Sequence, residues 1–139
     1  REELDSRGIT TVAQKAIGPY NCDLAAEPVA VEVFGGNWHW TGRHLARLQQ
    51  RLRYLLNARW HVLMIPVNIR SPLTPAVADY IAAYVKEARR HPTRRREYRM
   101  VWRAGEFTTS GHADDQNLSI KSALRRARTC PGRRPRRGT

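Results

Sequence analysis

Two short, nearly continuous apolar runs, residues 29–34 and 60–67, most constrain how this chain folds. Apolar runs without polar alternation are typical of strands that are buried inside a sheet. Between them, from residue 42 to 57, the period changes, because leucines recur every three or four residues on one side of a helix. These are Leu45, Leu48, Leu52, Leu55 and Leu56. The sequence therefore predicts a strand, a helix and a returning strand.

Turn residues and a second helical pattern extend this prediction on both sides. Strands are expected over residues 11–17 and 20–26, joined by the Gly18-Pro19 turn, after a short helix that ends at Gly8. Thr74-Pro75 predicts the start of a second helix, with an N-cap followed by proline at the first helical position. Its apolar face consists of Val77, Ile81, Tyr84, Val85 and Ala88. Residues 97–103 and 107–110 are predicted to form a hairpin.

Length and composition exclude several classes of protein. With 139 residues, 41% hydrophobic and 27% charged, the chain suits one folded domain and is not disordered throughout. No apolar run approaches the roughly 20 residues that a membrane span needs, and no segment resembles a signal peptide. Two cysteines, Cys22 and Cys130, cannot by themselves build a disulfide scaffold or a four-ligand zinc site. We therefore expect a protein of a reducing cytoplasm.

The charge balance points to a polyanionic partner. There are 25 Lys and Arg against 12 Asp and Glu, a net charge of +13, and most of the cations are arginine. Residues 1–40 are net acidic, whereas residues 116–139 carry eight cations and no acid. Arginine binds phosphate oxygens two at a time, which favours a nucleic acid. An anionic membrane surface and a GC-biased genome remain alternatives.

Two carboxylates lie inside predicted strands. Asp23 is in residues 20–26 and Glu32 in residues 29–34, so a short turn brings both acids onto neighbouring strands. A carboxylate in a buried strand is costly unless it is paired or bound to a metal. Two such acids on one face would repel each other, and a divalent cation relieves that repulsion. The alternative is that one acid pairs with an arginine from the helix.

A glycine-rich segment and an arginine-rich helix follow these acids. Gly35-Gly36 ends the strand, and Trp38 and His39 come next. Histidine suits proton transfer near neutral pH, and tryptophan suits stacking on bases, although such a pair is often only structural. In the helix, cations recur every fourth residue opposite the leucines, which predicts one exposed stripe for binding phosphates. The stripe consists of Arg43, Arg47 and Arg51.

These motifs resemble a known family. Residues 14–23, QKAIGPYNCD, and 31–39, VEVFGGNWH, are similar to the very-short-patch-repair endonucleases, and more so to the homing endonucleases described by an EDxHD motif. Residues 51–56 and 60–65 match that family's helix and returning strand, so the resemblance covers about residues 8–67. It implies an α/β fold of the PD-(D/E)xK, restriction-endonuclease-like type, a mixed sheet flanked by helices. It also implies a bacterial, phage or mobile-element origin.

The resemblance implies a Mg²⁺- or Mn²⁺-dependent enzyme that cuts double-stranded DNA. Asp23 would be the central metal ligand, and Glu32 or the backbone carbonyl of Val33 would complete the protein's share of the metal shell. His39 would be the general acid or base, with Trp38 against the duplex. Gln14 and His44 are additional catalytic candidates. Phe34 stands where the PD-(D/E)xK pattern has lysine, and the family's helical glutamate is expected in a segment that precedes this chain, where a targeting domain is also expected.

Three functions follow from these observations. The first is a metal-dependent DNA endonuclease formed by residues 1–115, with a basic and disordered tail over 116–139. The second is a degenerate nuclease fold that binds DNA without cutting, as the departures at Phe34 and the helical glutamate suggest. The third is a basic structural protein of a ribonucleoprotein, for which the arginine tail is the argument. A further metal site at His112, Asp114 and Asp115 is a minor alternative.

Overall fold

The computed structural model describes residues 1–35, 43–67 and 73–115. In chain order the elements are α1 (Glu2–Asp5), β1 (Val12–Ile17), β2 (Tyr20–Ala26), β3 (Val29–Gly35), α2 (Arg43–Asn57), β4 (His61–Val67), α3 (Pro75–Arg90), β5 (Tyr98–Val101) and β6 (Phe107–Gly111). The strands form one six-stranded sheet in the order β1-β2-β3-β4-β5-β6. The pairs β3–β4 and β4–β5 are parallel, and the other three pairs are antiparallel. The fold is therefore a mixed α/β sheet with helices.

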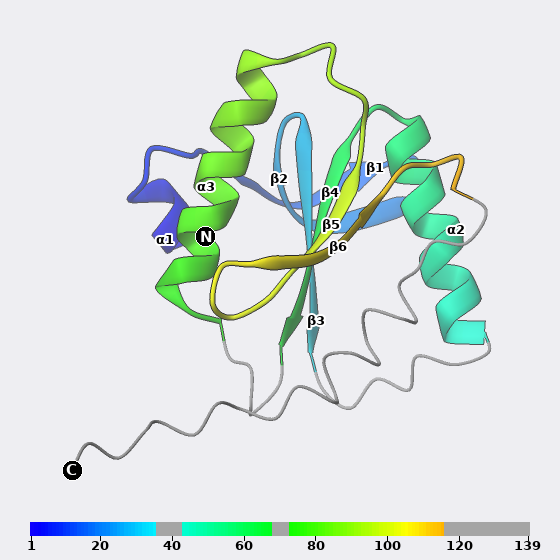
Figure 1. The fold of residues 1–139 in the computed structure, drawn as a ribbon, viewed down its shortest axis with the longest axis horizontal. Helices are drawn as coiled ribbons and strands as arrows, with labels where there is room; N and C mark the ends of the chain where they lie inside the picture. The colour runs from blue at the N-terminus through cyan, green and yellow to red at the C-terminus, as the bar shows by residue number, and fades with distance from the viewer. Residues whose placement is uncertain (36–42, 68–72, 116–139) are drawn as a thin grey trace.

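The two long helices cover opposite faces of the sheet (Figure 1). Alternate residues of the central strands serve the two faces, so that Val31 and Leu63 pack toward α3 while Ala30 and Met64 pack toward α2. This explains the nearly continuous apolar runs in β3 and β4, because both faces of these strands are buried. The predicted apolar faces of both helices are confirmed, with Leu45 the one partly buried member.

The turn between β1 and β2 lies close to helix α2. Gly18, between β1 and β2, has φ +56°, and a Cβ added there would lie 2.0 Å from the hydroxyl of Tyr54 on α2. The position thus requires glycine for two reasons, its left-handed backbone and the close approach of the tyrosine. Tyr54 also packs edge-on against Tyr20, with ring centroids 5.4 Å apart. The β1–β2 hairpin is therefore in direct contact with α2.

The predicted elements are confirmed in kind and order, with shifts of one to three residues at some ends. The hairpin predicted over 97–103 and 107–110 is the β5–β6 pair, and Gly105, with φ +72°, lies in its turn. The tail over residues 116–139 lies outside the described residues. Among the described residues, no helix is both long and apolar enough to cross a membrane.

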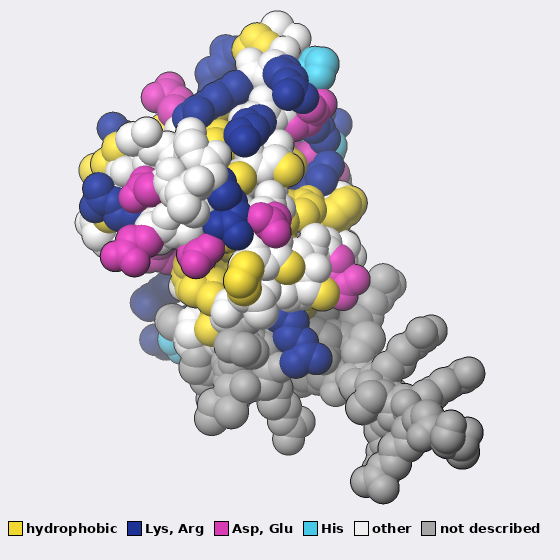
Figure 2. All heavy atoms as spheres, turned by 90° about the vertical axis from the view of Figure 1, so that its left-hand side faces the viewer, with side chains coloured by type: hydrophobic (Ala, Val, Ile, Leu, Met, Phe, Trp, Pro, Cys, Tyr) yellow, Lys and Arg dark blue, Asp and Glu magenta, His cyan; other side chains and the backbone are white. Residues whose placement is uncertain are grey.

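The face formed by α1 and α3 carries charges of both signs. Figure 2 shows Asp and Glu side chains among Lys and Arg on this side of the molecule. Arg7 bridges Glu3 of α1 and Asp79 of α3, with N–O distances of 2.6 and 2.7 Å. Because the acids neutralise much of the local positive charge, this face suits a polyanion less well than the side of α2 that carries the exposed Arg43 and Arg47.

Candidate active site

Asp23 lies where strands β2 and β3 stop pairing. The described register between them runs from Ala26–Val29 to Leu24–Val31, and Asp23 follows directly. Its Oδ2 accepts a hydrogen bond of 2.7 Å from the backbone N–H of Val33. A side-chain carboxylate thus takes the place of a backbone acceptor at this point of the sheet. The half-buried Asp23 is held against the main chain of β3, next to Glu32.

Glu32 is paired with an arginine of α2. Its side chain is buried, and Oε1 accepts hydrogen bonds from Arg51 Nε at 2.9 Å and Nη2 at 2.6 Å. Arg51 Nη2 also donates to the carbonyl of Asn21 at 2.5 Å, and the guanidinium lies 5.3 Å from the ring centroid of Tyr20. This is the pairing of an acid with a helix arginine that the sequence left open as the alternative to a metal.

The surroundings of Glu32 shift the pKa values of Glu32 itself and of the neighbouring Cys22 thiol. Burial raises the pKa of Glu32, the Arg51 guanidinium opposes that rise, and the nearby charge of Asp23 adds to it. Burial and the Glu32 carboxylate also raise the pKa of the Cys22 thiol to about 12. Cys22 is fully buried, so it stays protonated and unreactive near neutral pH, as expected for a core thiol.

A cavity of about 480 Å³ adjoins the site between α2 and the strands. Tyr20, Phe34 and Leu48 form its apolar wall, while His44, Arg47 and Arg51 bring polar groups from α2. The fold therefore places the predicted candidate His44 and the predicted phosphate ligand Arg47 beside Arg51, the partner of Glu32.

The predicted arginine stripe differs from the structure at one end. Arg43 and Arg47 are exposed, whereas Arg51 is half-buried because it turns inward to Glu32. Four-residue steps advance 400° around a helix, so each successive arginine is rotated by about 40° and the third faces the sheet. Binding of phosphates by all three arginines stays a prediction.

Gln14 lies opposite Asp23 in the β1–β2 hairpin. Its neighbours Ala13 and Lys15 pair with Leu24 and Cys22, and Gln14 itself has φ +50°. A left-handed backbone at a residue other than glycine is strained, and such strain occurs preferentially at functional sites. The structure thus brings Gln14 to the same stretch of sheet as Asp23.

Two predicted residues, Trp38 and His39, lie outside the described residues. Within the part of the chain that the structure describes, no three His, Cys, Asp or Glu side chains cluster as metal ligands. The minor alternative site is engaged otherwise, because Asp114 pairs with Arg95, Asp115 accepts from the backbone N–H of His112, and His112 Nδ1 lies 2.8 Å from the carbonyl of Arg96.

Sequence reasoning missed a second buried polar cluster, at the start of β4 and β5. Glu97 Oε1 accepts from Tyr84 at 2.9 Å, Arg94 at 2.8 Å and Arg99 at 3.0 Å. His61 Nδ1 lies 3.1 Å from the Tyr84 hydroxyl. Burial and the nearby Arg96 lower the pKa of His61 to about 4. His61 and Tyr84 are polar residues within segments predicted to be apolar, and they were the sequence features that could have indicated this cluster.

Comparison with known proteins gives one structural likeness. No family model and no curated protein matches the chain. Among solved structures, the chain is similar to the "Homing Endonuclease I-Bth0305I Catalytic Domain", with 18% identity and a TM-score of 0.41. The match covers 64% of this chain and 84% of that one. A TM-score below 0.5 reflects only partial agreement of the two folds, so the proposals below depend on the residues themselves.

Proposed function

We propose that this chain is a divalent-metal-dependent DNA endonuclease of the very-short-patch-repair and homing type, with a PD-(D/E)xK-like core. The observation that carries the proposal is the placement of Asp23, whose carboxylate is held by the N–H of Val33 at the opening between β2 and β3. The motifs around residues 14–23 and 31–39 support it, because the same aspartate is the metal ligand that the resemblance implies.

The donors at this point fit a hard divalent cation in part. Asp23 Oδ2 is engaged with Val33, so that among the contacts of residues 1–35, 43–67 and 73–115 Oδ1 is open to a cation beside the main chain of β3. Glu32 Oε1 is taken up by Arg51, so Glu32 would bind a cation only through Oε2 or after Arg51 releases it. Asp23 and the Val33 carbonyl are accordingly the proposed holders, with Glu32 as the exchangeable one.

A bound Mg²⁺ or Mn²⁺ would supply charge neutralisation at the scissile phosphate and a more acidic water. The chain's own groups complete the proposal. Arg43 and Arg47, both exposed on α2, bind the phosphate backbone. His44, in the adjoining cavity, holds or donates a proton at the phosphate, a role that the resemblance gives to His39. Double-stranded DNA is the proposed substrate.

A second candidate function is DNA binding without cleavage. The contact between Glu32 and Arg51 favours it, since an acid locked to an arginine is neutralised without any metal. Both functions predict binding to duplex DNA, so only a cutting assay separates them.

The test is nicking of supercoiled plasmid in Mg²⁺ and in EDTA, with wild type, Asp23→Ala and the control Glu106→Ala. Glu106 is an exposed acid in the β5–β6 turn, separated from Asp23 on β2 by strands β3 and β4, so its loss removes the same charge from another part of the sheet. We expect nicking by wild type and Glu106→Ala in Mg²⁺ alone, and loss of at least about 1,000-fold in Asp23→Ala with an unchanged melting temperature. Nicking by Asp23→Ala at the wild-type rate would refute the metal-ligand role. Binding of duplex DNA by a wild type that never nicks would favour the second function.

A further inference from the structure

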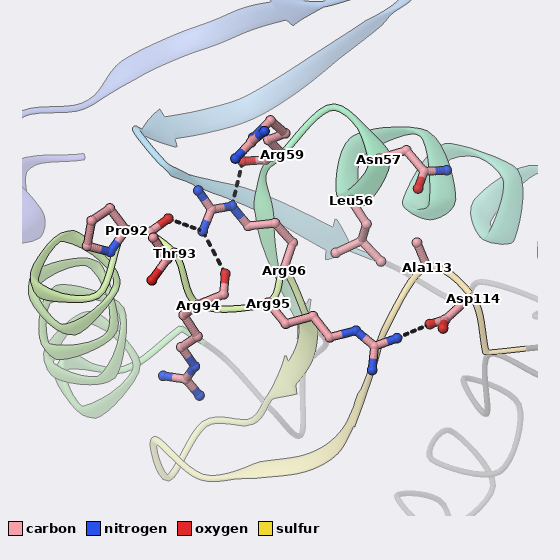
Figure 3. Close-up of a pocket in the computed structure, with 10 residues that line it drawn as sticks. All are labelled: Leu56, Asn57, Arg59, Pro92, Thr93, Arg94, Arg95, Arg96, Ala113 and Asp114. Atoms are coloured by element: carbon pink, nitrogen blue, oxygen red, sulfur yellow. Dashed lines mark hydrogen bonds and ion pairs between the residues drawn. The ribbon is translucent and has the colours of Figure 1, made fainter.

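A hollow of about 610 Å³ lies at the end of the sheet where the parallel strands begin, away from Asp23. Its lining comes from the end of α2, the segment before β5 and the segment after β6 (Figure 3). Four arginines contribute to it, Arg59, Arg94, Arg95 and Arg96, and Asp114 is the one acid among its ten lining residues. So many guanidinium groups around one hollow favour an anionic ligand.

One of these arginines holds the hollow together. Arg96 donates from Nε to the carbonyl of Arg59 at 2.8 Å, and from Nη1 to the carbonyls of Arg94 at 3.0 Å and Pro92 at 3.2 Å, as Figure 3 shows. These contacts tie the end of α2 to the segment before β5. Arg96 is thus a structural residue, and it fixes the backbone from which Arg59 and Arg95 project.

Arg59 occupies a position where its backbone is strained. The helix α2 ends in a Schellman motif, in which Trp60 N–H donates to the carbonyl of Leu55 at 3.0 Å and Arg59 N–H to that of Leu56 at 3.1 Å. The motif places Arg59 in the left-handed region, with φ +72°, where glycine is the usual residue. An arginine at this position makes the fold less stable than glycine would. Strain of this kind is found preferentially at functional sites, which favours a role for the Arg59 side chain.

The charges around the hollow leave an excess for a ligand. Arg95 pairs with Asp114, but both side chains are largely exposed, at 60% and 73%, so the pair can exchange for a stronger anion. Arg94 is taken up by the buried Glu97. The side chain of Arg59 is exposed, and among the described residues its guanidinium makes no hydrogen bond or ion pair.

We propose that Arg59 and Arg95 bind a phosphodiester of a nucleic-acid backbone, at a site separate from Asp23. This inference deepens the proposed function and depends on it for the choice of nucleic acid. The same helix links the two places, because Arg47 borders the cavity near Glu32 and Asn57 lines the hollow. Ten helical residues span about 15 Å, or about four base pairs of duplex, so one DNA molecule can reach both.

The test measures affinity for a fluorescein-labelled 20-base-pair duplex by anisotropy, in EDTA, over a range of salt concentrations. The variant is Arg59→Gln with Arg95→Gln. The matched control is Arg1→Gln with Arg90→Gln, which removes two exposed, ion-paired arginines that do not line the hollow. We expect the first variant to bind about 30-fold more weakly near 0.15 M salt and to lower the slope of log K against log salt by about 1.8. The control should change the slope by less than about 0.5.

Arg59→Gly separates a ligand role from a structural one. Glycine relieves the left-handed backbone, so the melting temperature should rise by about 2–4 °C while duplex affinity falls about fivefold. A loss of affinity in a more stable protein cannot come from unfolding. A variant that is more stable and binds as tightly as wild type would overturn the role of Arg59.

Two other outcomes would overturn the proposal. Equal slope changes in the paired variant and its control would mean that only diffuse charge attracts DNA. An unchanged slope, together with tight binding of an oligoglutamate peptide by wild type alone, would assign the hollow to an acidic protein partner. Since binding is measured in EDTA, none of these results depends on nicking, and a failure of the proposed endonuclease activity is recorded separately in the plasmid assay.

Discussion

Two buried glutamates, Glu32 and Glu97, are handled differently by the same sheet. They are 5% and 8% exposed, and both accept hydrogen bonds from arginine. Glu97 receives donors from three side chains, on α3, on β5 and on the segment before β5. Glu32 receives one arginine and the thiol of Cys22, and it has a second acid, Asp23, beside it. The first carboxylate has three side-chain donors on one oxygen, and the second has another acid beside it.

The difference separates a structural acid from a functional candidate. A carboxylate with three side-chain donors gains little from a further cation, whereas two neighbouring acids of which one is paired with an arginine gain more from one. Burial is the main reason that the pKa of Glu32 is raised, and the charge of Asp23 adds to it, so the folded protein disfavours the charged form of Glu32. Glu97 thus anchors β5 to α3, while Glu32 keeps the capacity to exchange its partner.

The largest expected effect is on stability when each glutamate becomes glutamine. Glu97→Gln leaves Arg94 and Arg99 without their carboxylate and should cost about 3 kcal/mol. Glu32→Gln should cost about 1 kcal/mol or less, because the loss of the Arg51 contact is offset by removing a charge that the folded state disfavours at pH 7. Urea unfolding of both variants at pH 7 provides the measurement. Equal losses would erase the distinction between the two sites.

A second prediction concerns the pH dependence of the Glu97 region. The pKa of His61 is lowered to about 4, chiefly by burial and then by Arg96, with Glu97 opposing. The unfolded chain therefore binds a proton near pH 6.5 that the folded chain refuses, so stability is full above pH 6.5 and falls as pH drops toward 4. We expect a loss of about 2 kcal/mol between pH 7 and pH 5.

The matching variants for this prediction are His61→Gln and His91→Gln. His91 is exposed at the end of α3 and pairs with Glu87. Urea midpoints at pH 7 and pH 5 should draw together in His61→Gln, although that protein is less stable at pH 7, and should stay apart in His91→Gln. A full pH dependence in His61→Gln would assign it to other groups.

The smallest expected effect sharpens the description of the Glu32 site. Arg51→Gln removes the guanidinium that pairs with Glu32 and leaves that acid beside Asp23 without its ion-pair partner. For a millimolar dissociation constant, 10 mM Mg²⁺ should then stabilise the variant by about 1 kcal/mol more than wild type, a shift of about 2–4 °C in melting temperature. Arg53→Gln, on the same helix but in contact with the carbonyl of Asp115, should show the wild-type response. Equal Mg²⁺ shifts in both variants would argue against a cation site between the acids.

Much of the fold could be predicted from the sequence, because it depends on local periodicity and turn chemistry. The nearly continuous apolar runs in β3 and β4 and the leucine face of α2 identify the residues that these elements bury in the core. The boundary at Thr74 follows from proline at the first position of α3.

The partners of the polar residues could not be predicted in the same way. Arg51 reaches Glu32 across 19 residues, and Tyr84 meets His61 across 23, through side chains whose rotamers depend on the assembled core. The four-residue spacing of Arg43, Arg47 and Arg51 was visible, but the 40° drift that turns the last one inward matters only once the sheet is in place. The hollow lined by Arg59, Arg94, Arg95 and Arg96 combines segments from the ends of three elements, so no single sequence motif identifies it.

The contact between Gly18 and Tyr54 has a consequence for how the protein tolerates change. The turn of the β1–β2 hairpin lies against Tyr54 of α2 so closely that a Cβ at position 18 would overlap the ring. The position of the hairpin relative to the helix therefore depends on this contact. Asp23 is on the hairpin, and Arg47 and Arg51 are on the helix. A methyl group at position 18 would therefore displace the Tyr54 ring or the turn itself, and either movement acts on an element that carries residues of the candidate site.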